Sequence, residues 1–161
     1  MTSNPSIILY AVGSSVGEGD LVQKAGCCIN MEFVDEYGRK STRKITHPIG
    51  NASEARAHLQ AAHMALASVI RSMRRLSTVE LRCPAIVGVV VREEMGKLCD
   101  DSCYRDDVVG NEDVIGEINK WSTFYDKLRF VPLAADDLLG RYDAKQCAES
   151  QKGSDTGTVY K

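Results

Sequence analysis

The sequence is poor in features that would mark a membrane, secreted or strongly nucleic-acid-binding protein. Aromatic residues make up 6% of its 161 residues, only one of them is tryptophan, and there are four prolines. The longest apolar run, residues 85–91, is far too short to cross a bilayer. The net charge is −2, so a nucleic acid would need a local basic patch rather than an overall positive field.

The N-terminal residues also lack the basic start of a secretory signal peptide. We therefore expect an intracellular, cytoplasmic protein without membrane contact, in which the six cysteines stay as thiols. Cys27 and Cys28 are neighbours in an apolar stretch and should point to opposite faces of a strand, one of them into the core. Cys99 and Cys103 have no second pair at zinc spacing, so we expect no metal and no cofactor.

Length and composition favour one globular domain. Apolar residues make up 43% of the chain and charged residues 26%, which is ordinary for a soluble fold. Residues 151–161 are polar and rich in Gly, Ser and Thr, so we expect a domain over residues 1–150 followed by a disordered tail.

The hydrophobic pattern predicts a mixed α/β domain. Strands are expected over residues 7–12, 25–34, 40–45, 79–83 and 128–131, and helices over 53–73, 112–125 and 141–149. The predicted architecture is a five-stranded mixed sheet that begins with three antiparallel strands and has helices on both faces.

The first helix carries the clearest pattern. Asn51 or Ser53 can cap it. Its apolar residues recur at spacings of four and three, which predicts a stripe facing the core: Ala55, Leu59, Ala62, Leu66, Val69 and Met73. We expect His63 and Trp121 to pack in the core as well. His47 should lie in a loop just before Pro48, because Pro48 and Gly50 end the third strand.

Two motifs resemble the ribonuclease H family. The run S-E-A-R-A-H-L-Q-A-A-H-M-A-L, residues 53–66, resembles the family's first helix, T-N-N-R-A-E-L-x-A-x-x-x-A-L. Residues 10–14, Y-A-V-G-S, resemble Y-T-D-G-S at the end of the family's first strand. The element order agrees, so the resemblance implies a ribonuclease H-like fold.

The resemblance also implies a missing catalytic site. Ribonuclease H uses four carboxylates to hold two divalent metal ions, which need oxygen ligands. The aligned positions here are Val12, His58, Pro84 and Asp143, so only Asp143 remains a carboxylate, and Asp136 offers a competing alignment for it. One carboxylate is too few for two metal ions, and we expect a degenerate member without nuclease activity.

The family's contacts to its RNA/DNA hybrid are altered in the same way. Glu54 and Ala55 stand where the family has two asparagines, next to Arg56, and Ile86 replaces a polar residue after the fourth strand. Glu54 would repel phosphate, and Ile86 has no side-chain hydrogen bond to donate. An acidic stretch, residues 100–107, replaces the basic insert of some members.

We therefore expect a non-catalytic interaction domain that binds a protein partner or a second copy of itself through an apolar patch of Val12, Pro84 and Ile86. One alternative is nucleic-acid binding without cleavage, through basic residues that lie along the chain at Lys24, Arg43, Lys44, Arg56 and Arg71–Arg75. Another is an enzyme with new chemistry at Ser14, His58 and Asp143.

Overall fold

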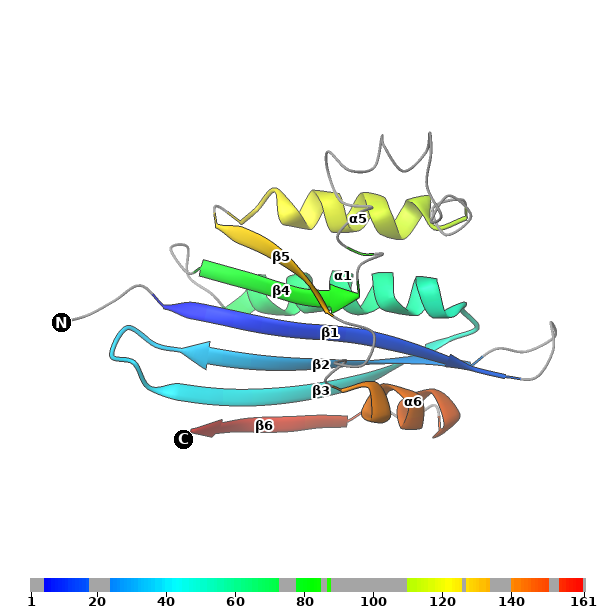
Figure 1. Cartoon of the computed structure of the whole chain (residues 1–161), viewed down its shortest axis with the longest axis horizontal. Helices are drawn as coiled ribbons and strands as arrows, with labels where there is room; N and C mark the ends of the chain where they lie inside the picture. Colours follow the sequence, from blue (N-terminus) through cyan, green and yellow to red (C-terminus); the bar gives the residue numbers. More distant parts are fainter. Residues whose placement is uncertain are drawn as a thin grey trace.

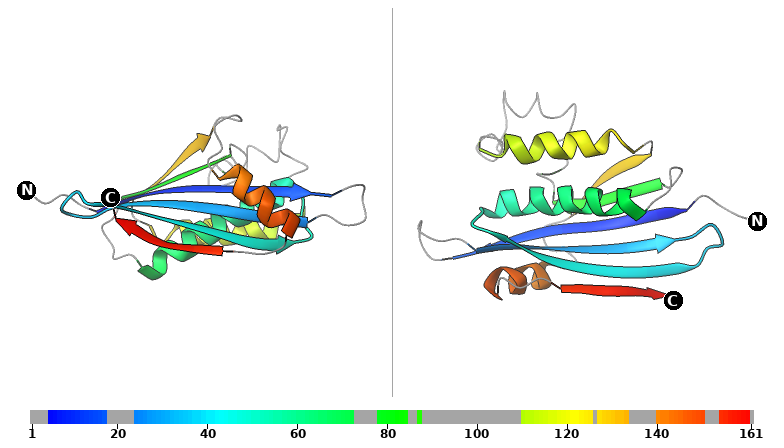
Figure 2. Two further views of the ribbon diagram at one scale, coloured as in Figure 1. Left: turned by 90° about the horizontal axis from the view of Figure 1, so that it is seen from below. Right: turned by 180° about the vertical axis from the view of Figure 1, so that it is seen from behind.

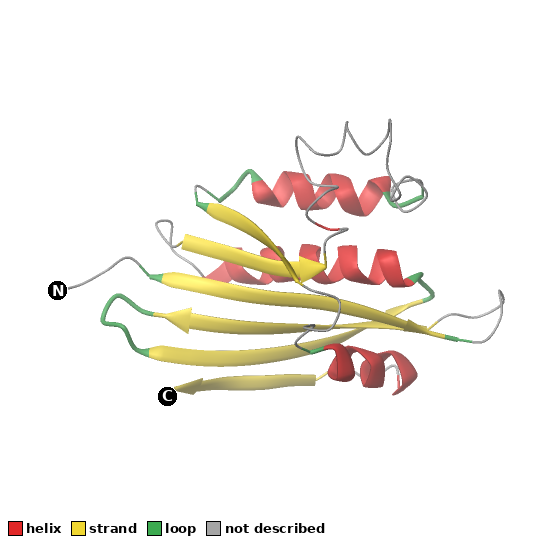
Figure 3. Ribbon diagram, in the orientation of Figure 1, coloured by secondary structure: helices red, strands yellow, loops and turns green. Residues whose placement is uncertain are grey.

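Strands and helices follow one another in the predicted order along the chain. The structure is a computed structural model, which describes residues 5–17, 24–72, 78–84, 87, 110–125, 127–133, 140–150 and 154–160. The strands within this part are β1 (Ser6–Val16), β2 (Lys24–Val34), β3 (Lys40–Gly50), β4 (Thr78–Pro84), β5 (Leu128–Leu133) and β6 (Ser154–Tyr160). The helices are α1 (Glu54–Ser72), α5 (Glu112–Ser122) and α6 (Arg141–Ser150) (Figure 3).

The strands form a single mixed sheet in the order β5-β4-β1-β2-β3-β6 (Figure 1). β1, β2 and β3 are antiparallel neighbours, while β4 runs parallel to β1 and β5 runs parallel to β4. Asp35 shapes the turn between β2 and β3, because its Oδ1 accepts the backbone N–H groups of Tyr37 at 2.9 Å and Arg39 at 2.8 Å. The five-stranded arrangement predicted from the sequence is confirmed.

A sixth strand corrects the prediction of a disordered tail over residues 151–161. Residues 154–160 form β6, which pairs antiparallel with β3 from Ser41↔Tyr160 to Thr46↔Ser154. Without β6, the outer edge of β3 would present unpaired N–H and C=O groups. The tail contains Thr156, Thr158, Val159 and Tyr160, residue types that suit a strand, and it therefore completes this edge.

β3 is also longer than predicted. It continues past Ile45 to Gly50, so His47 lies exposed on a strand rather than in a loop. The register shifts between Ala25 and Gly26, where Gly26 pairs with Pro48 and Ala25 pairs with Gly50. This irregularity accommodates a proline, which has no N–H group to donate to the ladder.

Helices cover both faces of the sheet. α1 packs on one face with α5 beside it, and α6 packs on the opposite face (Figure 2). Cys27 and Cys28 show the two sides, as predicted: Cys27 Sγ lies 3.8 Å from Met64 Sδ of α1, whereas Cys28 packs with Ala144 of α6. Both thiols are buried, so both belong to a core rather than only one of them.

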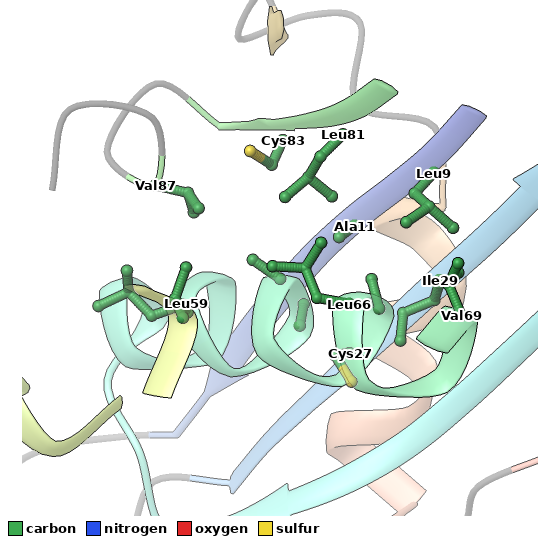
Figure 4. Packing of buried hydrophobic residues seen from close by; sticks show 14 of the residues in the cluster. Leu9, Ala11, Cys27, Ile29, Leu59, Leu66, Val69, Leu81, Cys83 and Val87 are labelled. Atoms are coloured by element: carbon green, nitrogen blue, oxygen red, sulfur yellow. The ribbon is translucent and has the colours of Figure 1, made fainter. Parts of the chain in front are cut away.

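The main core lies between α1 and the sheet. Leu59, Ala62, Leu66 and Val69 of α1 are fully buried, which confirms the predicted stripe. Figure 4 shows this helix lying against Leu9, Ile29 and Leu81 of the strands. Ala55 is partly buried against the same cluster, and Met73 lies outside the described residues.

His63 lies at the surface between α1 and α5 rather than in the core. It is half-buried, and its Nε2 is 3.9 Å from Glu117 Oε2. Trp121 is partly buried against the core, with its ring next to Phe124. Among the described residues, no helix is long and apolar enough to cross a membrane.

Candidate functional site

Two glycines let the helices approach the sheet closely where β1 and β2 meet. A Cβ atom on Gly13 of β1 would lie 2.3 Å from the carbonyl carbon of Ala57 in α1. A Cβ atom on Gly26 of β2 would lie 2.7 Å from the backbone nitrogen of Ala148 in α6. In the β1–β2 ladder, Gly13 pairs with Cys27 and the next residue, Ser14, pairs with Gly26. The contact of Gly13 with α1 and the contact of Gly26 with α6 therefore lie close together, on opposite faces of the sheet. Only glycine leaves enough room for both helices.

His58 is fixed by the first of these contacts. Its Nδ1 accepts a hydrogen bond of 2.9 Å from the backbone N–H of Gly13. Burial lowers the pKa of His58 from 6.5 to about 4, and the positive charge of Arg141 contributes to this decrease. The imidazole is therefore neutral at pH 7 and, because Nδ1 is the acceptor, it carries its hydrogen on Nε2.

Val12 is enclosed on the other face of β1. It is fully buried in a small cluster with Cys28 of β2 and Ala144 of α6. The sequence predicted an apolar patch that a partner would have to cover, and for Val12 this is wrong because α6 of the same chain covers it. Pro84 is the last residue of β4 and is half-buried. Because β4 runs parallel to β1 and Arg82 pairs with Tyr10, Pro84 lies at the same level of the sheet as Val12. Ile86 lies outside the described residues.

Arg141, the first residue of α6, is exposed, and its positive charge acts on His58. Asp143 lies on the β3 side, where its Oδ1 is 3.4 Å from Lys44 Nζ. Arg141 was not among the site residues predicted from the sequence. No sequence pattern marks it, because the orientation of α6 on the sheet is set by tertiary packing.

Ser14, Glu54 and Arg56 have different surroundings. Ser14 is buried on β1 opposite Gly26, and Glu54 is exposed at the start of α1. Arg56 joins α1 to the start of α5, because its Nη2 lies 2.8 Å from Asp113 Oδ2 and its Nη1 lies 3.1 Å from Asn111 Oδ1. The hydrogen bond from Arg56 lowers the pKa of Asp113 to about 2. Arg56 thus holds two helices together.

Among the described side chains, the basic residues of the nucleic-acid alternative lie on different elements. Lys24 begins β2, while Arg43 and Lys44 are consecutive in β3 and point to opposite faces of the sheet. Lys44 is paired with Asp143 and Arg56 with Asp113. The Arg71 side chain and the arginines after it lie outside the described side chains.

The residues of the enzyme alternative are engaged elsewhere. His58 Nδ1 is bonded to the Gly13 backbone, and the Asp143 carboxylate is bonded to Lys44. A Ser/His/Asp triad requires the carboxylate to orient the imidazole through Nδ1. The geometry around His58 differs from that arrangement.

Of the described residues, Val12, His58 and Arg141 are poor ligands for a divalent metal ion. Hard cations take oxygen ligands, whereas Val12 is apolar, His58 Nδ1 is occupied and Arg141 is positively charged. Within the described ranges, no group of three or more His, Cys, Asp or Glu side chains is arranged to hold a metal.

Comparison with known proteins identifies the fold. No family model matches the sequence, and no curated protein is detectably similar to it. Among solved structures, LC9-RNase H1, described as a type 1 RNase H with the type 2 active-site motif, superimposes with a TM-score of 0.71 at 17% identity, over 99% of this chain and 79% of that one. RNase H1 from Halobacterium salinarum gives a TM-score of 0.59 at 15% identity, over 91% and 99% of the two chains. The N-terminal RNase H domain of a Mycobacterium tuberculosis protein gives 0.58 at 16%, over 92% and 99%.

The chain has the ribonuclease H fold. At these identities the likeness concerns the fold alone, and the sequence motifs must indicate where the ribonuclease H site would lie. By the motif resemblance, Val12 would stand at the Asp of the first strand and His58 at the Glu of the first helix. A hydrogen bond from Gly13, the residue after Val12, holds His58 against β1, and the charge of Arg141 lowers the pKa of His58.

Proposed function

We propose that this chain is a non-catalytic ribonuclease H-fold domain that acts by binding a partner. The observation that carries the proposal is the constellation of Val12, His58 and Arg141 at the place indicated by the ribonuclease H motifs. An enclosed valine, a neutral imidazole and a guanidinium supply no negative charge there. Two-metal hydrolysis depends on carboxylates that hold the ions and stabilise the leaving oxygen.

The test combines cleavage with metal binding. The full chain is incubated with a labelled RNA/DNA hybrid in Mg²⁺ or Mn²⁺, and its melting temperature is measured with and without each ion. We expect no cleavage and an unchanged melting temperature. A stabilisation of about 3 kcal/mol, which mass action gives near a hundredfold excess of ion over its dissociation constant, would contradict the proposal. Cleavage that disappears in Asp143→Asn would contradict it more directly.

A protein partner or a second copy of the chain remains the first candidate for what is bound. The feature that supports such a partner is the edge of the sheet. The apolar patch does not support it, because α6 covers Val12. β6 ends the sheet on one side, and its sequence S-D-T-G-T-V-Y has no proline, whereas β5 at the other edge contains Pro132. Strand edges without such protection pair readily with other strands.

Self-association is tested by sedimentation velocity over a range of protein concentrations. A concentration-dependent dimer that is lost in Thr158→Pro would support pairing through β6. A monomer at all concentrations would exclude the second copy as partner.

A further inference from the structure

We propose that the exposed side of α5, with the turn after it, is a docking surface for an arginine side chain of a protein partner. The arginine would lie against Trp121, Phe124 and Glu117. The inference rests on the function proposed above, because it names the chemistry that a bound protein partner would present. The surface is separate from the sheet edge, since α5 and β6 lie at opposite sides of the molecule (Figure 1).

The rings of Trp121 and Phe124 form an aromatic pair at the end of α5. Their centroids are 5.7 Å apart, and the ring planes are tilted by 50°. Phe124 is 60% exposed, while Trp121 is partly buried against the core. Single exposed apolar side chains are common, whereas exposed apolar groups that adjoin one another mark interaction surfaces.

Elsewhere the chain places its own arginines over aromatic rings. The guanidinium carbon of Arg39 lies 5.5 Å from the ring centroid of Tyr37, and that of Arg82 lies 5.2 Å from the ring centroid of Tyr10. Among the described residues, no lysine or arginine lies over the aromatic pair of α5. The exposed part of this pair is therefore available to a cation from another molecule, and the ring of tryptophan attracts cations most strongly.

The indole of Trp121 exposes carbon and not its polar atom. Its Nε1 is buried and has no hydrogen-bond acceptor among the described residues. Any surface that the ring exposes therefore belongs to its π system, which is the part that a cation contacts. The chain has no other tryptophan, so its tryptophan fluorescence reports on this place alone.

Glu117 supplies a negative charge beside the rings. It lies four residues before Trp121, so the two side chains are neighbours on the helix surface. The carboxylate is 49% exposed, and its Oε2 lies 3.9 Å from Nε2 of His63 in α1. Burial lowers the pKa of His63, so this imidazole is neutral at pH 7 and does not cancel the charge of Glu117.

The charge of α5 favours a cationic partner. The helix has three acidic residues and one basic residue, Lys120. Asp113 is paired with Arg56 at 2.8 Å, which leaves Glu112 and Glu117 exposed. A guanidinium can stack flat on a ring while its N–H groups bind a carboxylate, and an ammonium group has no such plane. Arginine therefore fits this surface better than lysine does.

The experiment follows the fluorescence of Trp121 in the full chain. Three short peptides are titrated, in which glycine alternates with arginine, lysine or glutamate. We expect a saturable change with the arginine peptide, weaker binding of the lysine peptide and no change with the glutamate peptide. Phe124→Leu, which keeps apolar bulk but removes the ring, should weaken binding of the arginine peptide about two- to fivefold. Glu117→Gln should also weaken it and should reduce its dependence on salt.

Two substitutions on α6 are the matched controls, because α6 packs on the opposite face of the sheet from α1 and α5 (Figure 2). Tyr142→Leu removes another exposed aromatic ring, and Glu149→Gln removes another exposed carboxylate. Both should leave the affinity for the arginine peptide unchanged.

Absence of a saturable fluorescence change with the arginine peptide would overturn the inference. Equal losses in Phe124→Leu and Tyr142→Leu would also overturn it, because the peptide would then bind by non-specific attraction. Neither result alters the cleavage and metal assays, whereas metal-dependent cleavage would remove the proposed non-catalytic role. Failure of the one is therefore distinguishable from failure of the other.

Discussion

At the scale of single residues, the site depends on a glycine as much as on its polar groups. Gly13 brings the backbone of β1 against α1, and the same residue donates the hydrogen bond that fixes His58. The missing side chain of Gly13 lets α1 pack closely, and its N–H group positions the His58 ring. A side chain at this position would separate the strand from the helix.

Gly13→Ala should destabilise the fold, because the added Cβ would lie 2.3 Å from the Ala57 carbonyl carbon and 2.5 Å from its oxygen. Overpacking of this kind costs about 1–3 kcal/mol, measured as the free energy of unfolding in urea. Gly116→Ala is the control, since a Cβ on Gly116 in α5 meets nothing within 4 Å. This second substitution should stabilise the protein by about 0.5–1 kcal/mol. Equal effects of the two substitutions would contradict the close approach.

His58 should make the stability depend on pH. Its pKa is about 4 in the folded chain and 6.5 when unfolded, so the unfolded state binds more protons between these values. Above pH 6.5, the contribution of His58 to the free energy of unfolding should not change with pH. Below pH 6.5 it should fall, by up to about 3 kcal/mol in total once the pH has passed below 4.

His58→Gln should flatten this dependence in urea denaturation curves recorded at several pH values. His63→Gln should have a smaller effect than His58→Gln, because burial also lowers the pKa of His63 but Glu117 opposes this shift. An unchanged pH profile in His58→Gln would show that the imidazole is not held neutral.

At the scale of elements, α1 was the most predictable part of the chain. Its apolar spacing gave the buried face of Leu59, Ala62 and Leu66, because a helix buries one stripe whatever it packs against. β6 was not predictable from its polar composition, since its pairing depends on the edge that β3 offers. Arg141 could not be assigned for a related reason: how α6 lies on the sheet is decided by tertiary packing.

Leu66→Ala should cost about 2–5 kcal/mol of unfolding free energy, because Leu66 is fully buried between α1 and the sheet. Lys120→Ala, at an exposed position of α5, should stay within about 0.5 kcal/mol of the unmodified chain. Urea denaturation measures both. A small effect of Leu66→Ala would place α1 away from the sheet and contradict the fold.

Removal of residues 151–161 tests the role of β6. We expect the shortened chain to stay folded, because the five-stranded core and its helices do not include the tail. The amides of β3 that pair with β6 should exchange with deuterium much faster, while those paired with β2 keep their protection. Global unfolding of the shortened chain would show that β6 is needed for the fold.

At the scale of the whole molecule, the architecture and the site were predictable to different degrees. The order of strands and helices followed from local patterns, and the structure joins His58 to the backbone of Gly13, the residue after Val12. The exposed apolar patch was predicted wrongly for Val12, because burial at a strand end depends on which helix returns to cover it. Here the last helix of the domain does so, about 130 residues later in the chain.

The paired close approaches at Gly13 and Gly26 also bear on how readily the site can be changed. They let the backbones of β1 and β2 come close to α1 and α6, beside the contacts that Val12 makes with Ala144 and His58 makes with Gly13. Combining Val12→Asp, His58→Glu and Arg141→Asp would place oxygen ligands on this frame of close backbone contacts. Gain of Mn²⁺ affinity in that variant would mean that a few side chains decide whether the frame holds a metal ion.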